Sequence, residues 1–194
     1  YMLTDVASVC NAYRVDVIVS HTPVENASDE AALVRVQALF PQAQFIEQAG
    51  KNIFNKMANS VEYALGEGYE QAILIGSDLP SIMTSHLDCA FQALAHHELF
   101  FNPSSDGGYS LIAMSAWYPE VFDIAPKQED QVLRLSLDQV SSCGARVKIG
   151  EVLDDIDTPE DVQDFLALAE KSEALAQTHT YKFFHQFTPN DVHD

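Results

Sequence analysis

Three groups of acidic residues have the types and spacing that could do chemistry. Asp78 directly follows an apolar run, Asp106 opens an Asp-Gly-Gly turn, and Asp155 and Asp157 follow a β-branched run. Carboxylates that converge to about 4 Å repel by roughly 4 kcal/mol at an effective dielectric of 20, so they need a cation or a raised pKa. Mg²⁺ prefers one or two carboxylates together with substrate phosphates. The pattern fits a protein that handles an anionic nucleotide through Mg²⁺ or Mn²⁺, both of which accept oxygen ligands.

Each acidic group also has a structural interpretation. Asp78 suits a turn, and Asp106 with its two glycines is a common turn sequence. Asp155 and Asp157 could be solvated charges around the start of the last helix. Because all three groups fall at the ends of expected strands, the functional interpretation is favoured over coincidence.

A further turn, Gly50-Lys51-Asn52, lies between an expected strand and an expected helix. It either presents backbone N–H groups and a lysine to a phosphate or base, or is an ordinary connection. The common phosphate-binding runs G-x-G-x-x-G and Walker A are absent from the sequence, as is the G-x-S-x-G hydrolase elbow. The histidines have no zinc-like spacing.

The elements that must position these residues alternate along the chain. Strands are expected over 15–20, 43–47, 71–76, 98–101, 109–114 and 146–152, and helices over 2–13, 29–40, 52–65, 84–95, 128–143 and from Thr158 onward. This rhythm predicts an α/β fold with a mostly parallel sheet and helices on both faces. In such sheets ligands bind outside the carboxyl ends of the strands, where the acidic groups lie. The last part of the chain, with its aromatic run 180–187, is expected to dock on the core or on a second subunit, which makes a homodimer worth testing.

Composition excludes several classes of function. The chain has 194 residues with 29 Asp and Glu against 10 Lys and Arg, which gives a net charge of −19. This balance argues against binding a nucleic-acid polymer or an anionic membrane surface. The sequence has no apolar run approaching the roughly 20 residues of a membrane span. Its three scattered cysteines suit a reducing cytoplasm and are expected to be buried structural thiols rather than zinc ligands.

The acidic blocks resemble the signature sequences of a known family. They are Ile75–Pro80 (IGSDLP), Asn102–Ile112 (NPSSDGGYSLI) and Asp155–Asp161 (DIDTPED). In order and spacing they resemble the glycosyltransferase family associated with radical-SAM and selenium-domain genes, which has the GT-A nucleotide-diphosphosugar transferase fold. They are similar, more loosely, to cytidylyl- and guanylyltransferases such as CMP-KDO synthetase and 2-phospholactate guanylyltransferase.

This resemblance covers residues 1–170 as one GT-A-like domain and leaves residues 171–194 as a C-terminal aromatic extension. It implies that Asp78 and Asp157 hold the divalent metal ion and that Asp106 is the catalytic residue beside the acceptor or sugar. The other implied sites are the nucleotide-binding residues Gly50, Asn52 and Ser77, and the substrate-binding residues Gly107, Gly108, Tyr109 and Asp155.

One departure from the family affects the expected sheet. Members of the family begin with a strand and a Gly- and Lys/Arg-rich loop for the nucleotide phosphates, whereas this sequence starts inside the first helix. We therefore expect the sheet to lack that strand and to have an exposed edge.

Three hypotheses about function remain. The first is a metal-dependent glycosyltransferase that moves a sugar from a nucleotide sugar to a small-molecule acceptor. The second is a nucleotidyltransferase that joins NMP from an NTP to a small acidic molecule. The third is a non-catalytic relative of the fold, which the missing basic loop would favour.

Overall fold

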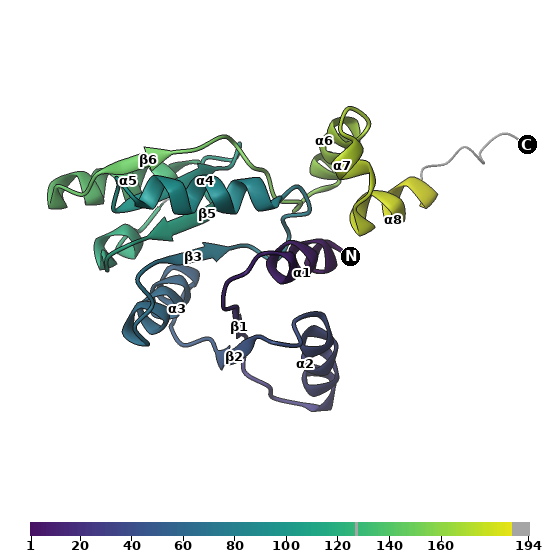
Figure 1. Cartoon of the computed structure of the whole chain (residues 1–194), viewed down its shortest axis with the longest axis horizontal. Helices are drawn as coiled ribbons and strands as arrows, with labels where there is room; N and C mark the ends of the chain where they lie inside the picture. The colour runs from purple at the N-terminus through teal and green to yellow at the C-terminus, as the bar shows by residue number, and fades with distance from the viewer. Residues whose placement is uncertain (127, 188–194) are drawn as a thin grey trace, which may run out of the picture.

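The strands form two separate sheets (Figure 1). In the computed structural model, which describes residues 1–126 and 128–187, β1 (Ile18–His21) pairs in parallel with β2 (Gln44–Glu47). The larger sheet has the order β3-β5-β4-β6, formed by β3 (Ala72–Ile75), β5 (Tyr109–Met114), β4 (Leu99–Pro103) and β6 (Val147–Ile149). Strand β5 is antiparallel to both of its neighbours, and β4 is parallel to β6, so β3, β4 and β6 all run in one direction.

The predicted α/β architecture is confirmed, with β5 as the reversed strand of the larger sheet. Within the described residues, β1 pairs only with β2 and β3 only with β5, so each keeps one unpaired edge. The expected exposed strand edges are therefore present in this part of the chain. Strand β6 is shorter than predicted, because its ladder with β4 ends at Ile149.

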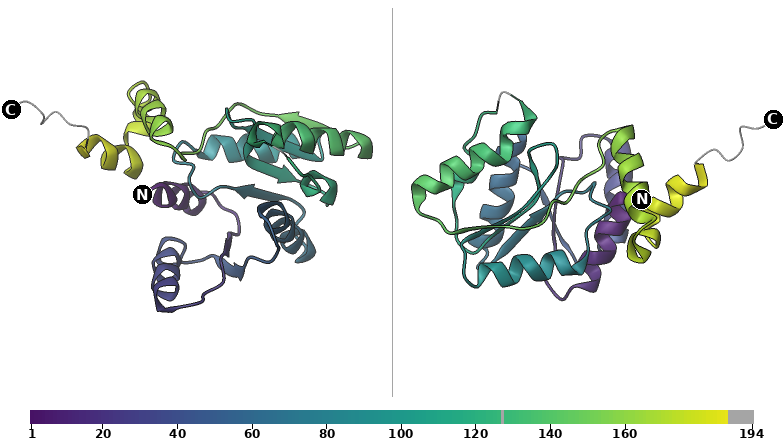
Figure 2. Two further views of the ribbon diagram at one scale, coloured as in Figure 1. Left: turned by 180° about the vertical axis from the view of Figure 1, so that it is seen from behind. Right: turned by 90° about the horizontal axis from the view of Figure 1, so that it is seen from above.

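Helices cover both faces of the larger sheet (Figures 1 and 2). These covering helices are α1 (Met2–Ala12) and α4 (Thr84–Leu94) on one face and α3 (Ile53–Gly66) and α5 (Val132–Cys143) on the other. The other helices are α2 (Ala27–Leu39), α6 (Pro159–Ala169), α7 (Glu173–Ala176) and α8 (His179–Phe187), with 3-10 turns at Pro119–Phe122 and Glu129–Gln131. Along β4, Phe100 packs with α4 and α1, whereas Leu99 and Phe101 pack with α3 and α5. Because successive side chains of a strand point to opposite faces, this buried strand joins the two halves of the core.

The predicted helix 128–143 is divided in the structure. A 3-10 turn at Glu129–Gln131 precedes α5, which begins at Val132 and ends at Gly144 in a left-handed conformation. The division changes the direction of the chain just before α5. As a result, the segment before the helix reaches the carboxyl edge of the sheet.

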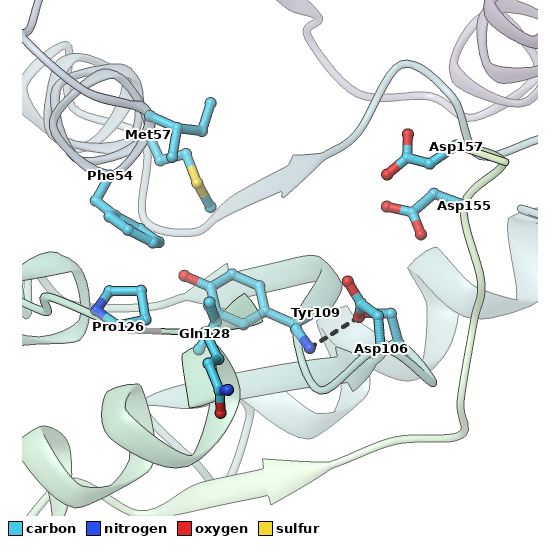
Figure 3. A pocket seen from close by; sticks show the side chains of 12 residues that line it. Phe54, Met57, Asp106, Tyr109, Pro126, Gln128, Asp155 and Asp157 are labelled. Carbon is cyan, nitrogen blue, oxygen red and sulfur yellow. Dashed lines mark hydrogen bonds between the residues drawn. The ribbon is translucent and has the colours of Figure 1, made fainter. Parts of the chain in front are cut away.

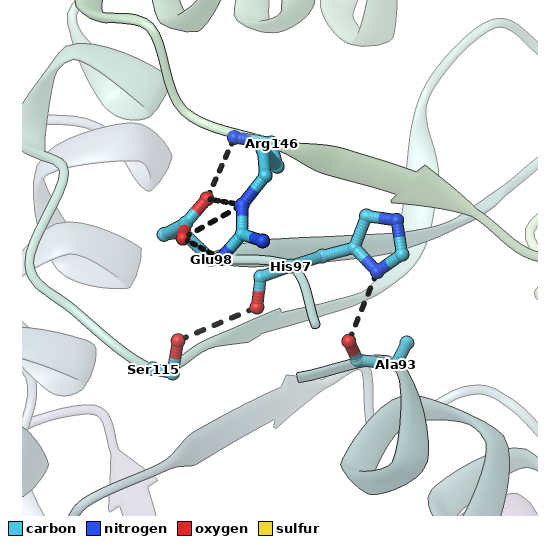
Figure 4. A network of polar contacts seen from close by, with 5 residues as sticks. All are labelled: Ala93, His97, Glu98, Ser115 and Arg146. Atoms are coloured by element: carbon cyan, nitrogen blue, oxygen red, sulfur yellow. Dashed lines mark hydrogen bonds and ion pairs between the residues drawn. The ribbon is translucent and has the colours of Figure 1, made fainter. Parts of the chain in front are cut away.

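An ion pair fixes the start of β4 against β6 (Figure 4). The Arg146 guanidinium donates to the Glu98 carboxylate at 2.5 Å from Nη2, and the Arg146 backbone N–H donates to it at 2.7 Å. These bonds lower the pKa of Glu98 to about 2. The pair stands at the edge of the sheet opposite the acidic groups and holds the register of the two strands.

The C-terminal helices pack on the N-terminal helix. The Asp5 carboxylate, on α1, accepts hydrogen bonds from the backbone N–H of His179 at 2.7 Å and of Thr180 at 2.9 Å. The ring of Tyr1 stacks on Phe183 with centroids 4.2 Å apart. The aromatic extension therefore docks on α1 of this chain through the first half of α8, and residues 188–194 of the predicted extension lie outside the described residues.

The prediction of buried thiols is wrong for two cysteines. Cys89 and Cys143 are exposed and Cys10 is half-buried, and all three are free. Cys89 lies on α4 and Cys143 ends α5, so both occupy helix surfaces that face away from the core. In the described part of the chain, no helix has the length and apolar character needed to cross a membrane.

Candidate active site

Three loops meet at the carboxyl edge of the larger sheet. They follow β3, β4 and β6, and they carry Asp78, Asp106 and the acidic segment 154–157. Parallel direction alone brings the ends of these strands to one edge. Backbone hydrogen bonds then join the loops: the Ile156 N–H donates to the Asp78 carbonyl at 3.0 Å, and the Leu153 N–H donates to the Pro103 carbonyl at 2.8 Å.

Asp154 fastens this junction, a role that the sequence analysis did not identify. Its carboxylate accepts from the Ser105 backbone N–H at 2.7 Å and from the Ser105 hydroxyl at 3.1 Å. Its backbone carbonyl accepts from the Ser81 hydroxyl at 3.2 Å. Asp154 therefore joins the last loop to both of the other loops. Its carboxylate is engaged in hydrogen bonds within the protein.

Asp106 is oriented by its own turn. Its Oδ1 accepts from the Ser104 hydroxyl and from the Gly108 N–H, the latter at 2.9 Å. Gly107 makes the turn possible, because its φ of 93° suits glycine and an added Cβ would lie 2.5 Å from the Asp130 backbone. Both of these hydrogen bonds use Oδ1, which leaves the second carboxylate oxygen, Oδ2, to accept from a ligand.

A cavity of about 520 Å³ opens where these loops meet α3 (Figure 3). Its polar side carries Ser104, Asp106, Gly108, Asp155 and Asp157. Its other side carries Ile53, Phe54, Met57, Tyr109, Pro126, Gln128 and Val132. Figure 3 shows the three carboxylates gathered at one end and Phe54, Met57 and Pro126 at the other, with the ring of Tyr109 between them.

Asp155 is the carboxylate whose proton affinity the site raises. The pKa of Asp155 rises to about 6, mainly because burial disfavours its charged form. The neighbouring charges of Asp157, Asp78 and Asp106 act in the same direction. Burial also raises the pKa of Tyr109 to about 12, so its hydroxyl stays protonated. The polar end of the cavity is therefore a concentrated negative site at neutral pH.

The donor set at this end fits a hard divalent cation. Among the described residues, no three His, Cys, Asp or Glu side chains form a ready-made metal cage. Mg²⁺ and Mn²⁺ can instead be held by one or two carboxylates while a ligand's phosphates complete the coordination. Such a cation would offset the neighbouring charges that, together with burial, raise the pKa of Asp155.

The structure brings together most of the predicted substrate-binding residues. Asp106, Gly108, Tyr109, Asp155 and Asp157 line the cavity. Gly107 packs under the turn and receives the Leu133 N–H on its carbonyl at 2.9 Å, so it supports the cavity from outside.

The remaining predicted residues stand around the cavity rather than on its wall. Asn52 is the N-cap of α3 and accepts the Asn55 N–H at 2.8 Å, and Gly50 adopts a φ of 132° beside it. Ser77 is exposed on the loop after β3, and Asp78 is next to it. Asp78 influences the site through its charge on Asp155. The nucleotide-binding role of Gly50, Asn52 and Ser77 stays a prediction.

The apolar wall was missed by the sequence analysis. Phe54 and Met57 lie one turn apart on α3 and read as ordinary core positions, and they do pack against the core on one side. The available signal was Ile53, an apolar residue at the first position of the helix, which is 58% exposed. Pro126 and Gln128, which come before α5, also line the cavity.

The amino-acid sequence matches the profile of one protein family. Residues 5–126 match the profile of a family described as "Uncharacterized protein conserved in bacteria (DUF2064)". This stretch covers most of the chain and includes the acidic groups at Asp78 and Asp106. No curated protein matches the sequence.

Solved structures share the fold. A protein of Desulfovibrio desulfuricans G20, provisionally assigned as a nucleotide-diphospho-sugar transferase, superposes with a TM-score of 0.82 at 24% identity, over 95% of this chain and 79% of that chain. A cytidylyltransferase of Leptospira borgpetersenii serovar Hardjo-bovis gives a TM-score of 0.60 at 12% identity, over 91% of this chain and 85% of the other. A 4-diphosphocytidyl-2C-methyl-D-erythritol synthase of Anaerococcus prevotii DSM 20548 gives 0.58 at 10% identity, over 82% of each chain. At these identities the likeness concerns the fold.

Proposed function

Because the chain belongs to the DUF2064 family and shares the fold of nucleotide-using transferases, we propose that it is a metal-dependent glycosyltransferase. Its donor would be a nucleotide-activated sugar and its acceptor a small molecule. The observation that carries the proposal is the convergence of Asp106, Asp155 and Asp157 at one end of a single cavity. The likeness of fold to the Desulfovibrio protein supports a nucleotide-using transferase in general.

Asp157 and Asp78 would hold the divalent ion. When bound, the ion would neutralise the charge on the diphosphate leaving group. The proposed role of Asp157 is supported by its place on the cavity wall, and that of Asp78 by its influence on Asp155. Asp155 would tolerate a neighbouring anion in the absence of metal, because its raised pKa allows it to take up a proton near pH 6.

Asp106 would act on the acceptor. Its Oδ1 is fixed by Ser104 and Gly108, so Oδ2 can accept the proton of an acceptor hydroxyl as a general base. The acceptor oxygen then bonds to the anomeric carbon of the sugar while the bond from that carbon to the nucleoside diphosphate breaks. The chain's own contribution is thus to orient the acceptor and to remove one proton.

A binding experiment tests the metal assignment. Thermal unfolding with a panel of nucleotide sugars and nucleoside triphosphates, with and without Mn²⁺ or Mg²⁺, should give a stabilisation that chelator abolishes. A ligand at 100 times its Kd adds about 2.7 kcal/mol of apparent stability. For a domain of this size that corresponds to roughly 5–10 °C.

Variants sharpen this experiment. Asp157→Asn and Asp78→Asn should lose metal-dependent stabilisation, whereas Asp164→Asn, an exposed change on α6, should keep it. Unchanged metal-dependent stabilisation in both Asp157→Asn and Asp78→Asn would refute the metal assignment. Silence of the wild type across the whole panel would favour the non-catalytic hypothesis.

A second candidate, nucleotidyl transfer, is supported by the cytidylyltransferases that share the fold. Product analysis separates the two reactions. Release of a nucleoside diphosphate from a nucleotide sugar supports glycosyl transfer, and release of pyrophosphate from a triphosphate supports nucleotidyl transfer.

A further inference from the structure

The cavity that carries the carboxylates is chemically divided, and its second half has no task in the chemistry described so far. Asp106, Asp155 and Asp157 gather at one end, and Phe54, Met57 and Pro126 at the other (Figure 3). The ring of Tyr109 lies between the two ends. A molecule that reaches Asp106 with a reactive hydroxyl must therefore place the rest of its body against apolar side chains.

The apolar half is more exposed than packing of the fold requires. Phe54 and Met57 rest on the core with one side, and their other side lines the cavity. Ile53 belongs to no described core cluster, and 58% of its surface is open to solvent at the cavity rim. An apolar surface grouped beside a few convergent polar groups is the usual composition of a small-molecule site.

Charge narrows the class of molecule that fits. No Lys or Arg is found among the described residues that line the cavity, while three carboxylates do line it. The chain as a whole carries a net charge of −19. The proposed divalent ion would be engaged by the diphosphate of the donor, so an acidic acceptor brought against Asp106 would still meet like charge, whereas an uncharged acceptor would not. Lys127 lies outside the described residues, and an acidic probe in the experiment below tests its contribution.

We propose that the acceptor of this enzyme is an uncharged alcohol with an apolar body, one aromatic ring or a short branched chain in size. Its hydroxyl meets Asp106 Oδ2, and its body lies against Phe54, Met57 and Ile53. This inference rests on the proposed transferase function and selects an acceptor class within it. It also argues against the small acidic acceptor of the nucleotidyltransferase hypothesis.

The test measures direct binding of two probes that differ in charge. In ligand-observed NMR titrations without nucleotide, 4-methylbenzyl alcohol should bind the wild-type protein at least tenfold more tightly than 4-methylbenzoate. Phe54→Ala should weaken binding of the alcohol about 10- to 100-fold, because it removes a ring's worth of buried apolar surface. Because Phe54 also touches the core, Ile53→Ser serves as a second variant that leaves the core intact and should weaken binding about 3- to 10-fold.

Leu168→Ala is the matched control, since Leu168 is a similarly exposed apolar residue, 52% open to solvent on α6, away from the cavity. It should bind the alcohol as the wild type does. The inference is overturned if the benzoate binds as tightly as the alcohol, if Phe54→Ala and Ile53→Ser bind the alcohol unchanged, or if the alcohol does not bind.

Metal-dependent nucleotide binding, measured on the same variants, separates this inference from the proposed function. Retained nucleotide binding with a failed alcohol test refutes the acceptor class alone. If the wild-type protein shows no metal-dependent nucleotide binding, the proposed transferase function is refuted.

Discussion

Replacement of Asp155 by asparagine should stabilise the metal-free protein. The pKa of Asp155 rises from 3.8 to about 6 on folding, because burial and the charges of Asp157, Asp78 and Asp106 disfavour its ionised form. A carboxylate with a pKa raised in this way lowers the free energy of unfolding at neutral pH. Asparagine keeps the shape of the side chain and removes the charge.

The sign of the pH dependence follows from proton binding. Between pH 4 and pH 6 the folded state holds a proton on Asp155 that the unfolded state has lost, so the free energy of unfolding falls as pH rises through this window. Above pH 7 the loss is complete. A change of pKa from 3.8 to about 6 corresponds to about 3 kcal/mol if fully transmitted. Solvent screening of this partly exposed group reduces the expected value to about 1 kcal/mol.

Urea unfolding in the presence of chelator is the appropriate assay. Asp155→Asn should exceed the wild type by about 1 kcal/mol at pH 8, and the two should coincide at pH 4. In thermal unfolding the gain at pH 8 corresponds to roughly 2–4 °C. Asp164→Asn, an exposed change far from the cavity, should show no such pH-dependent difference. A destabilised Asp155→Asn at pH 8, or a gain that is the same at pH 4, would refute the idea that burial and the neighbouring charges disfavour ionised Asp155 in the folded protein.

Three further predictions concern the scaffold. Glu98→Gln should lower stability above pH 5 and leave it unchanged near pH 2. The reason is that the pKa of Glu98 falls to about 2 beside Arg146, so the stabilisation from the ion pair is lost as pH falls from about 4.5 to 2. Urea unfolding across that pH range measures the difference, and a loss of stability that persists at pH 2 would contradict the prediction. Gly107→Ala should lower the free energy of unfolding by about 1–3 kcal/mol, since it combines a φ of 93° with a Cβ only 2.5 Å from the Asp130 backbone. A variant that unfolds at the same urea concentration as the wild type would contradict that turn geometry. Asp5→Ala should lower the free energy of unfolding by about 1–2 kcal/mol, because two backbone N–H groups of α8 lose their acceptor. Amide hydrogen exchange should become faster in α8 and stay slow in β4 and β5. Unchanged exchange in α8 would show that packing alone holds the helix.

Local sequence determined the elements and the polar end of the site. The run 109–114 forms β5 with the predicted bounds, and Thr158 with Asp161 forms the capping box that starts α6. Acidic residues at the ends of strands were enough to predict a carboxylate cluster, because strands of one direction end at one edge. Strand periodicity, helix caps and turn glycines depend on interactions between residues close in sequence, so they can be predicted before the fold is known.

Tertiary structure alone decided the apolar end and the fine structure of the polar end. Phe54 and Met57 have the spacing of core residues, and only the position of α3 over the loop after β4 turns one of their sides toward the cavity. Adjacent carboxylates differ as well: Asp154 is taken up by Ser105, whereas Asp155 remains in the cavity with a raised pKa. Burial, hydrogen-bond partners and the field of distant charges are properties of the assembled chain, and they separate two neighbouring residues of identical chemistry into a structural clamp and a candidate reactive group.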